Sequence, residues 1–206
     1  MLGHVSAAVL IPVKAFHLAK ARLAGTLAPA ERASLARAMA SLVLAAAAPL
    51  PVYVVCDDEE VARWAGSGGA HVVWRPGHGL NGAVTSGVAA LADVGFTSAV
   101  VAHSDLPLAV QLDRLVAGPG GVLLVPDRRE DGTNVAVVPT DASFTFAYGP
   151  GSFHRHVAEA QRLGLAITVV REPDALGWDV DLPDDLDHPS LKGLLPSLPT
   201  NPASHP

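Results

Sequence analysis

Short, almost unbroken apolar segments alternate with helix-like segments along most of the chain, and this alternation limits the folds open to it. A strand with one face in water alternates apolar and polar residues, so a continuous apolar run of about 4–8 residues predicts a strand covered on both faces. Helices between such strands are typical of a mostly parallel sheet. The predicted strands are Ala7–Val13, Val52–Val55, His71–Trp74, Ser98–Ala102, Gly121–Val125, Val135–Val138 and Ala166–Val170.

Apolar residues at helical spacing predict the helices between these strands. The clearest patterns are Leu35, Met39, Leu42, Val43 and Ala46, and Leu80, Val84, Val88 and Leu91, with weaker ones over Glu59–Ala65, Val110–Ala117 and Ser152–Leu163. The order of elements predicts a single-domain α/β fold, with a mostly parallel, Rossmann-like sheet flanked by helices. Ligands of such sheets bind at the carboxyl ends of the strands.

The length and the charge limit the classes of function. A chain of 206 residues fits one domain, which we place at residues 1–187, followed by a flexible tail at 188–206 that contains five prolines. A net charge of −6 argues against a nucleic-acid partner, and no apolar stretch approaches the length of a membrane span. Cys56 is the sole cysteine, which excludes a disulfide or a thiolate zinc site. We expect a soluble, cytoplasmic protein.

Two acidic groups are candidates for a metal site. Asp105 directly follows the predicted strand 98–102, and carboxylates at such a position are natural ligands for Mg²⁺. Asp179 and Asp181 have the spacing of residues on one face of a strand, so they can share a cation with Asp105. The alternatives are that Asp105 caps the segment after Pro107 and that the later pair lies in a solvated turn. Asp184 and Asp185 favour a cap of a short final helix.

Cations and glycines near the other strand ends are candidates for binding phosphates and a nucleoside. Lys14 ends the first strand, and Lys20 and Arg22 follow it in a loop, where they can clamp a triphosphate. Gly79 and Asn81 lie in a glycine-rich segment that leads into a helix and allows a close backbone approach. The alternatives are a solvated basic patch and a tight turn with Asn81 near the helix start.

Three further features have weaker signals. The segment Gly149-Pro150-Gly151-Ser152 opens a helix whose exposed N–H groups suit a carboxylate or phosphate, although Ser152 can also be a simple N-cap. Asp57 and Asp58 favour a cap of the following helix, with nucleotide contact as the other possibility. His154 and His156 are two apart on a helix, so they do not face one ligand.

The order of these motifs resembles one family more closely than any single motif does. IPVK, AKARL, GLNGAV, SDLP, DGTN, YGPGSF and DVDLPDDL occur in this order between Val9 and Asp185, and the set resembles the CofC/FbiD family. These are the 2-phospho-L-lactate or phosphoenolpyruvate guanylyltransferases of coenzyme F420 biosynthesis. His103, Ser104 and His78 depart from the family's usual residues.

The resemblance implies the nucleoside-diphosphate-sugar transferase type of fold and a role for each candidate residue. By this resemblance, GTP would be bound by Lys14, Lys20, Arg22, Gly79 and Asn81, and the catalytic residues would be Lys14 and Asp105. Mg²⁺ would be held by Asp105, Asp179 and Asp181, and the phosphorylated acid would be bound by Thr133, Gly149, Gly151 and Ser152.

The reaction that the resemblance implies is attack of the acceptor's phosphate on the α-phosphorus of GTP, which releases pyrophosphate. The acceptor is phosphoenolpyruvate or 2-phospho-L-lactate, and a downstream transferase of the pathway is a possible recipient of the product. The alternatives are a sugar-phosphate or molybdopterin-type nucleotidyltransferase of the same fold and a non-catalytic nucleotide-binding relative. IPVKAFHLAKARL in place of their glycine-rich basic loop argues against the first.

Overall fold

A seven-stranded sheet runs through the computed structural model, which describes residues 6–115 and 120–191. The strand order is β3-β2-β1-β4-β6-β5-β7, and within the described residues β6 alone runs against the others. The mostly parallel α/β fold expected from the sequence is therefore confirmed. The strands are β1 (Ala7–Pro12), β2 (Val52–Cys56), β3 (His71–Trp74), β4 (Ser98–Ala102), β5 (Gly121–Pro126), β6 (Thr133–Pro139) and β7 (Ala166–Val169).

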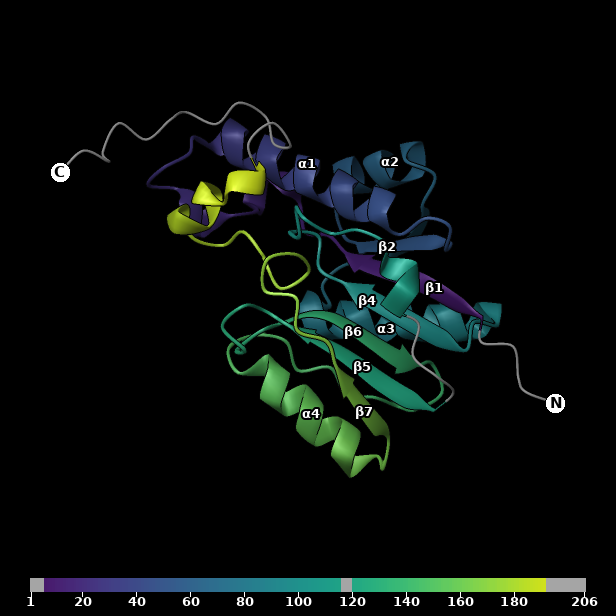
Figure 1. Ribbon diagram of the computed structural model, residues 1–206. Helices are drawn as coiled ribbons and strands as arrows, with labels where there is room; N and C mark the ends of the chain where they lie inside the picture. The colour runs from purple at the N-terminus through teal and green to yellow at the C-terminus, as the bar shows by residue number, and fades with distance from the viewer. Residues whose placement is uncertain (1–5, 116–119, 192–206) are drawn as a thin grey trace.

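Helices cover both faces of the sheet, as Figure 1 shows. The helices α1 and α2 pack on one face, and α3 and α4 pack on the other. The α-helices are α1 (Pro29–Ala46), α2 (Glu59–Ser67), α3 (Gly79–Val94) and α4 (Ser152–Arg162), and the short 3-10 turns are η1 (Phe16–Leu18), η2 (Ala21–Leu23), η3 (Leu112–Leu115), η4 (Pro183–Asp187) and η5 (Pro189–Leu191). None of the helices in the described part of the chain has the length and apolar character that crossing a bilayer requires.

The central strand β1 explains why the strands read as continuous apolar runs. Val9 and Ile11 pack into the core under α1 and α2, whereas Ala8 and Leu10 pack into the core under α3 and α4. Successive side chains of a strand point to opposite faces, so both sets must be apolar when both faces are covered. Gly87 of α3 allows the closest approach, because a Cβ there would lie 2.6 Å from Leu10 Cδ2.

One predicted helix is wrong. The pattern over Val110–Ala117 indicates an α-helix, but the described part of it forms only the 3-10 turn η3, and residues 116 and 117 lie outside the described residues. Gln111 has φ 51°, a left-handed conformation that helices do not continue through. The helix therefore cannot begin before Leu112.

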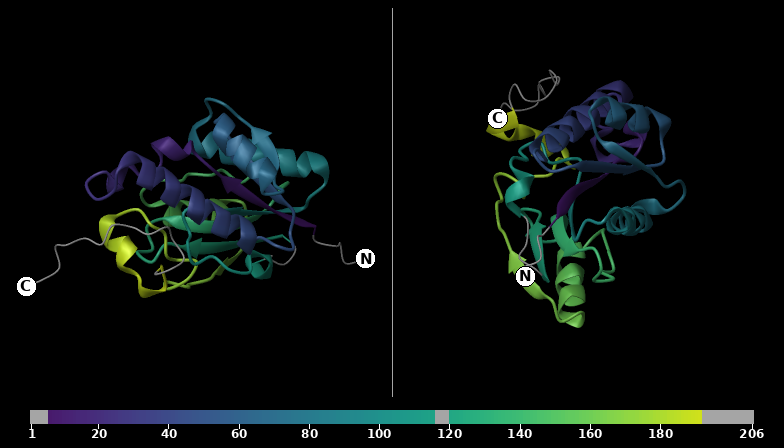
Figure 2. Two further views of the ribbon diagram at one scale, coloured as in Figure 1. Left: turned by 90° about the horizontal axis from the view of Figure 1, so that it is seen from above. Right: turned by 90° about the vertical axis from the view of Figure 1, so that its right-hand side faces the viewer.

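The end of the described chain packs against the start of α1. Leu191 is 4% exposed and lies in a small apolar cluster with Leu27, Leu35, Met39 and Val180. Figure 2 shows this yellow segment beside α1. The packed body therefore extends at least to Leu191, and the remainder of the predicted tail, 192–206, lies outside the described residues.

Candidate active site

The carboxyl ends of β1 and β4 bring the two predicted catalytic residues together. Lys14 follows β1 and Asp105 follows β4, and these strands are parallel neighbours in the sheet. Both residues line a cavity of about 400 Å³, and both also line a second cavity of about 190 Å³. The structure thus places a cation and a carboxylate at one edge of the sheet, where ligands of α/β folds bind.

Lys20 joins the acidic residues instead of standing apart from them. Its Nζ donates to Asp105 Oδ2 at 2.6 Å and to Asp181 Oδ1 at 3.0 Å, and Arg22 donates to Asp181 Oδ2 at 3.3 Å. Burial alone would lower the pKa of Lys20, but the two carboxylates outweigh it and hold that pKa above its usual range. Burial would likewise raise the pKa of Asp105, yet the Lys20 ammonium holds it below its usual value. This part of the site is charged at neutral pH.

Asp179 is the least compensated carboxylate of the group. Burial first, and then the charges of Asp105 and Asp181, raise the pKa of Asp179 to about 6. The buried Oδ1 atoms of Asp179 and Asp105 accept no hydrogen bond from the described residues. Two carboxylate oxygens without partners in a buried, negatively charged site favour a further cation as ligand.

Asp185 fixes the segment that carries Asp179 and Asp181. Its side chain is fully buried, and its Oδ2 accepts the N–H groups of Asp181 and Leu182 at 2.7 Å each. The guanidinium groups of Arg128 and Arg129 pair with its Oδ1. Burial alone would raise the pKa of Asp185, but these hydrogen bonds hold it below its usual value. The predicted cap is confirmed for Asp185, which also holds the backbone of Asp181.

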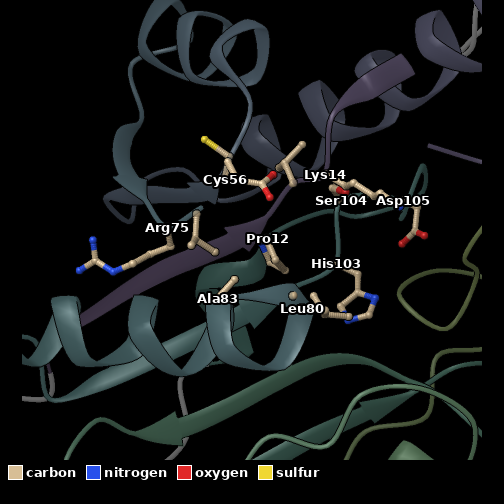
Figure 3. Close-up of a pocket in the computed structure, with 13 residues that line it drawn as sticks. Pro12, Lys14, Cys56, Arg75, Leu80, Ala83, His103, Ser104 and Asp105 are labelled. Carbon is tan, nitrogen blue, oxygen red and sulfur yellow. The ribbon is translucent and has the colours of Figure 1, made fainter. Parts of the chain in front are cut away.

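The larger cavity crosses the carboxyl edge of the sheet from β3 to β4 (Figure 3). Arg75 lies at one end of it and His103, Ser104 and Asp105 lie at the other, with Leu80 of α3 along one wall. Its remaining lining residues are Pro12, Val13, Lys14, Val55, Cys56, Asp57, Gly79 and Ala83. The cavity is mixed in character, with apolar walls and charged groups at the strand ends, as sites for small organic ligands commonly are.

Of the two residues of the glycine-rich segment predicted to bind the nucleotide, Gly79 lines the cavity and Asn81 does not. Gly79, with φ 59°, begins α3 at the cavity wall. Asn81 lies one half-turn further, where its Oδ1 accepts the N–H of Tyr148 at 2.7 Å. Asn81 thus ties the start of α3 to the loop before α4, and its binding of a nucleotide stays a prediction.

The predicted acceptor residues Thr133 and Ser152 lie deep in the protein. Thr133 is 2% exposed and Ser152 is 1% exposed, and Ser152 Oγ lies 3.4 Å from Thr133 Oγ1. His156 Nδ1 lies 3.0 Å from the same Thr133 oxygen, while His156 Nε2 accepts the N–H of Ala147. Since Nε2 is the acceptor, Nδ1 carries the proton and donates a hydrogen bond to Thr133 Oγ1. Burial lowers the pKa of His156 to about 4, which keeps the ring neutral.

The helix start at Gly149 and Gly151 already holds a carboxylate. Both glycines have positive φ, 116° and 71°, and the N–H of Gly151 donates to Asp131 Oδ1 at 3.0 Å. Gly151 occupies the N-cap position of α4, so the alternative that Ser152 is the N-cap is wrong. These residues, like Thr133 and Ser152, lie outside the lining of the two cavities described above. Their contact with an acceptor stays a prediction.

Several residues of the site could not be found from the sequence motifs. Arg128 stacks on Trp178, with its guanidinium carbon 3.9 Å from the ring centroid, and pairs with Asp185. His156 cannot share a ligand with His154, and the spacing of these two histidines gives no sign of the hydrogen bond between His156 and Thr133 of another element. The charged dipeptide at 128–129 beside the acidic segment was the only signal for the arginines.

The carboxylates suit Mg²⁺ in chemistry, although they are not arranged around one point. Among residues 6–115 and 120–191, no group of three or more Asp, Glu, His or Cys side chains converges as the ligands of one ion do. Lys20 Nζ instead lies between Asp105 and Asp181. The unpaired oxygens of Asp105 and Asp179 are hard donors of the kind that Mg²⁺ prefers, so the donor set fits the ion.

Comparison with solved structures defines the class of fold. A structure described as a putative nucleotide-diphospho-sugar transferase from Desulfovibrio desulfuricans superposes with a TM-score of 0.74 at 17% identity, over 92% of this chain and 89% of that one. A nucleotidyl transferase from Methanothermobacter gives a TM-score of 0.62 at 18% identity, over 89% and 94%. The fold is therefore of the nucleotidyltransferase type.

Sequence comparison places the chain within that class. Residues 7–193 match the family described as guanylyl transferase CofC like, and the chain belongs to this family. It is 36% identical over 186 residues to the phosphoenolpyruvate guanylyltransferase of Sphaerobacter thermophilus, covering 86% of this chain and 89% of the relative. It is 36% identical over 204 residues to the enzyme of that name from Conexibacter woesei, covering 94% and 90%. The family and the enzyme class predicted from the motifs are confirmed.

Proposed function

We propose that this protein transfers GMP from GTP to the phosphate of phosphoenolpyruvate and releases pyrophosphate, as a step of coenzyme F420 biosynthesis. The observation that carries the proposal is the cavity of about 400 Å³ that ends at Lys14 and Asp105 in a chain of the CofC-like family. The relatives' names favour phosphoenolpyruvate over 2-phospho-L-lactate as the acceptor. The product would pass to a downstream transferase of the same pathway.

The chemistry requires positioning and charge neutralisation more than a general base. The acceptor is a phosphate whose second pKa is about 6, so it is largely ionised at neutral pH and can attack the α-phosphorus directly. The obstacle is repulsion between two polyanions and the charge that develops on pyrophosphate. Lys14, which lines both cavities, would lie beside the α-phosphate, and its charge, with those of Lys20 and Arg22, would lower that barrier electrostatically.

We assign Asp105, Asp179 and Asp181 as the residues that would hold Mg²⁺. When bound, the ion supplies positive charge to the reacting and leaving phosphates. Asp185 accepts the backbone N–H of Asp181 and so holds in place the backbone that carries that carboxylate. Because Lys20 now pairs with Asp105 and Asp181, its ammonium would share or yield these carboxylates when the ion and GTP bind.

We assign the carboxylate of phosphoenolpyruvate to Thr133, Gly149, Gly151 and Ser152. The start of α4 suits a carboxylate because the Gly151 N–H already donates to one, that of Asp131. The acceptor would replace Asp131 there, and the buried hydroxyls would have to open toward it. Ser152→Ala should raise the KM for phosphoenolpyruvate by about tenfold, the loss of one hydrogen bond to a charged group, and leave the KM for GTP unchanged.

Pyrophosphate release by the purified protein tests the proposal. Reactions contain Mg²⁺ and one of GTP, ATP, CTP or UTP, with phosphoenolpyruvate, 2-phospho-L-lactate or 3-phosphoglycerate as acceptor, and mass spectrometry identifies the product. We expect release with GTP and phosphoenolpyruvate. Release only with another nucleotide, or no nucleotide adduct with any acid when a downstream transferase is present to draw off the product, would refute it.

Two variants separate the site from the fold. Asp105→Asn should lower turnover by at least about 100-fold, because it removes a carboxylate from the centre of charge. Asp93→Asn makes the same change at an exposed position near the far end of α3 and should leave turnover unchanged. Circular dichroism checks that both variants are folded.

A further inference from the structure

The two neighbouring aspartates after β2 have different surroundings. Asp58 is the N-cap of α2, and its Oδ1 accepts the N–H groups of Glu60 and Val61 at 3.0 Å each. Asp57 is exposed, lines the larger cavity, and has no side-chain hydrogen bond or ion pair within the part of the chain described. The cap therefore accounts for Asp58 alone, and Asp57 is available to a ligand.

The order of strands sets Asp57 apart from the reacting phosphates. The strand β1 lies between β2 and β4, so Asp57 and Asp105 follow strands that are two spacings apart, about 10 Å. Lys14 follows the strand between them. A carboxylate close to the triphosphate would repel it, whereas one displaced along the edge of the sheet can face the neutral part of the nucleotide.

The cavity that Asp57 lines also has an apolar, open wall. Leu80 is 44% exposed although it is a large apolar residue, and it lines the cavity together with Ala83 and Pro12. Figure 3 shows these residues between Arg75 at one end and Asp105 at the other. An exposed leucine in a cavity wall gives a flat heterocycle a surface to pack on.

We propose that Asp57 reads the guanine base: its carboxylate accepts the N1–H and 2-amino hydrogens while the ring packs on Leu80. The inference rests on the proposed function and names the residue that selects the nucleotide. Guanine presents two donors on one edge, which match the two oxygens of a carboxylate. Adenine presents a lone pair at N1 and no 2-amino group, so it would leave the carboxylate unpaired and repelled.

Asp57→Asn tests the proposal through a gain of activity. Xanthine has a carbonyl where guanine has its 2-amino group, so an asparagine amide can accept from N1–H and donate to that oxygen. We expect kcat/KM for GTP to fall by about 10- to 100-fold, since one hydrogen bond to a charged group is lost. Activity with XTP should rise, and ITP, which lacks the 2-amino group, should become at least as good a substrate as GTP.

The control and a binding measurement keep this test separate from that of the proposed function. Asp58→Asn makes the same change next door, retains a capping side chain, and should keep the preference for GTP. Isothermal titration of both proteins with GTP, XTP and ATP, without acceptor, reports the base preference even if no acceptor is turned over. An unchanged GTP preference in Asp57→Asn, an equal loss with every nucleotide, or a wild-type protein that binds ATP as well as GTP would overturn the inference.

Discussion

The ionised side chain of Asp179 should lower the free energy of unfolding at neutral pH, and the variant Asp179→Asn should show by how much. Burial and the nearby charges raise its pKa from 3.8 to about 6, so the ionised form is disfavoured in the folded state. A difference of roughly two pH units corresponds to about 3 kcal/mol at neutral pH, and partial exposure to solvent reduces this to about 1–3 kcal/mol. Asparagine keeps the shape of the side chain and removes the charge, so the variant should be more stable by that amount.

The pH dependence gives the sign of the effect. A raised folded pKa means that the penalty is absent below the unfolded pKa and fully present above the folded one. The variant's advantage should therefore be largest above pH 7, shrink as the pH falls below 6, and be nearly gone at about pH 4. Asp184→Asn, at an exposed position of the same segment, should change the free energy of unfolding by less than about 0.5 kcal/mol at every pH.

Urea unfolding followed by circular dichroism measures these differences. The slopes of the unfolding curves must agree between the proteins for the free energies to be compared. A variant no more stable than the wild type at pH 7.5, or an advantage that persists at pH 4, would refute the argument. Adding MgCl₂ should stabilise the wild type more than the variant, and equal stabilisation of both would contradict Asp179 as a ligand.

Other residues of the site give further predictions. Lys20→Met should lower the free energy of unfolding at pH 7.5 by about 3–5 kcal/mol, because it leaves the largely buried carboxylate of Asp105 without its ion pair. A loss below about 1 kcal/mol in urea unfolding would contradict a buried ion pair. His156→Gln should remove a pH dependence: the depressed pKa of His156, about 4, means that stability present above pH 6.5 is lost on acidification. Between pH 7.5 and 5 the wild type should thus lose about 2 kcal/mol more than the variant, and equal losses would show that the ring is not held neutral. Asp185→Asn should lower kcat/KM by about 10- to 100-fold, because it weakens hydrogen bonds that hold a proposed metal ligand in place. An unchanged kcat/KM would show that Asp185 contributes to the fold and not to catalysis.

The inner strands β1, β4, β5 and β6 could be predicted closely because they are buried on both faces, whereas the edge strands β3 and β7 are largely exposed. A strand that is buried on both faces is a continuous apolar run, and this pattern can be recognised in the sequence of that strand alone. The prediction of a helix over Val110–Ala117 was wrong because the conformation of this segment depends on the rest of the chain. Its apolar spacing was present, but the backbone of Gln111 and the exposure of Val110, at 61%, are set by the surrounding chain.

The candidate site was predictable in its positions and not in its pairings. Lys14 and Asp105 could be placed because both follow predicted parallel strands, whose carboxyl ends share one edge. The contact of Lys20 with Asp105 joins residues 85 positions apart, and its contact with Asp181 joins residues 161 apart. No local pattern determines which of several cations reaches which carboxylate, because the loop conformations decide it.

Hydrogen-bond partners distinguish adjacent aspartates that the sequence alone presents as equivalent. Asp58 and Asp185 each accept two backbone N–H groups, and both hold the backbone of a functional segment. Asp57 lines a cavity without a partner in the described chain, and Asp179 keeps a buried oxygen unpaired with a raised pKa. A satisfied carboxylate stabilises the fold, whereas a buried unsatisfied one such as that of Asp179 lowers stability until a ligand reaches it. Such a buried carboxylate persists in a folded chain because its partner arrives from outside, so Asp179 is where the cation should bind. Asp57 is exposed in the larger cavity, and it is where the base of the nucleotide should bind.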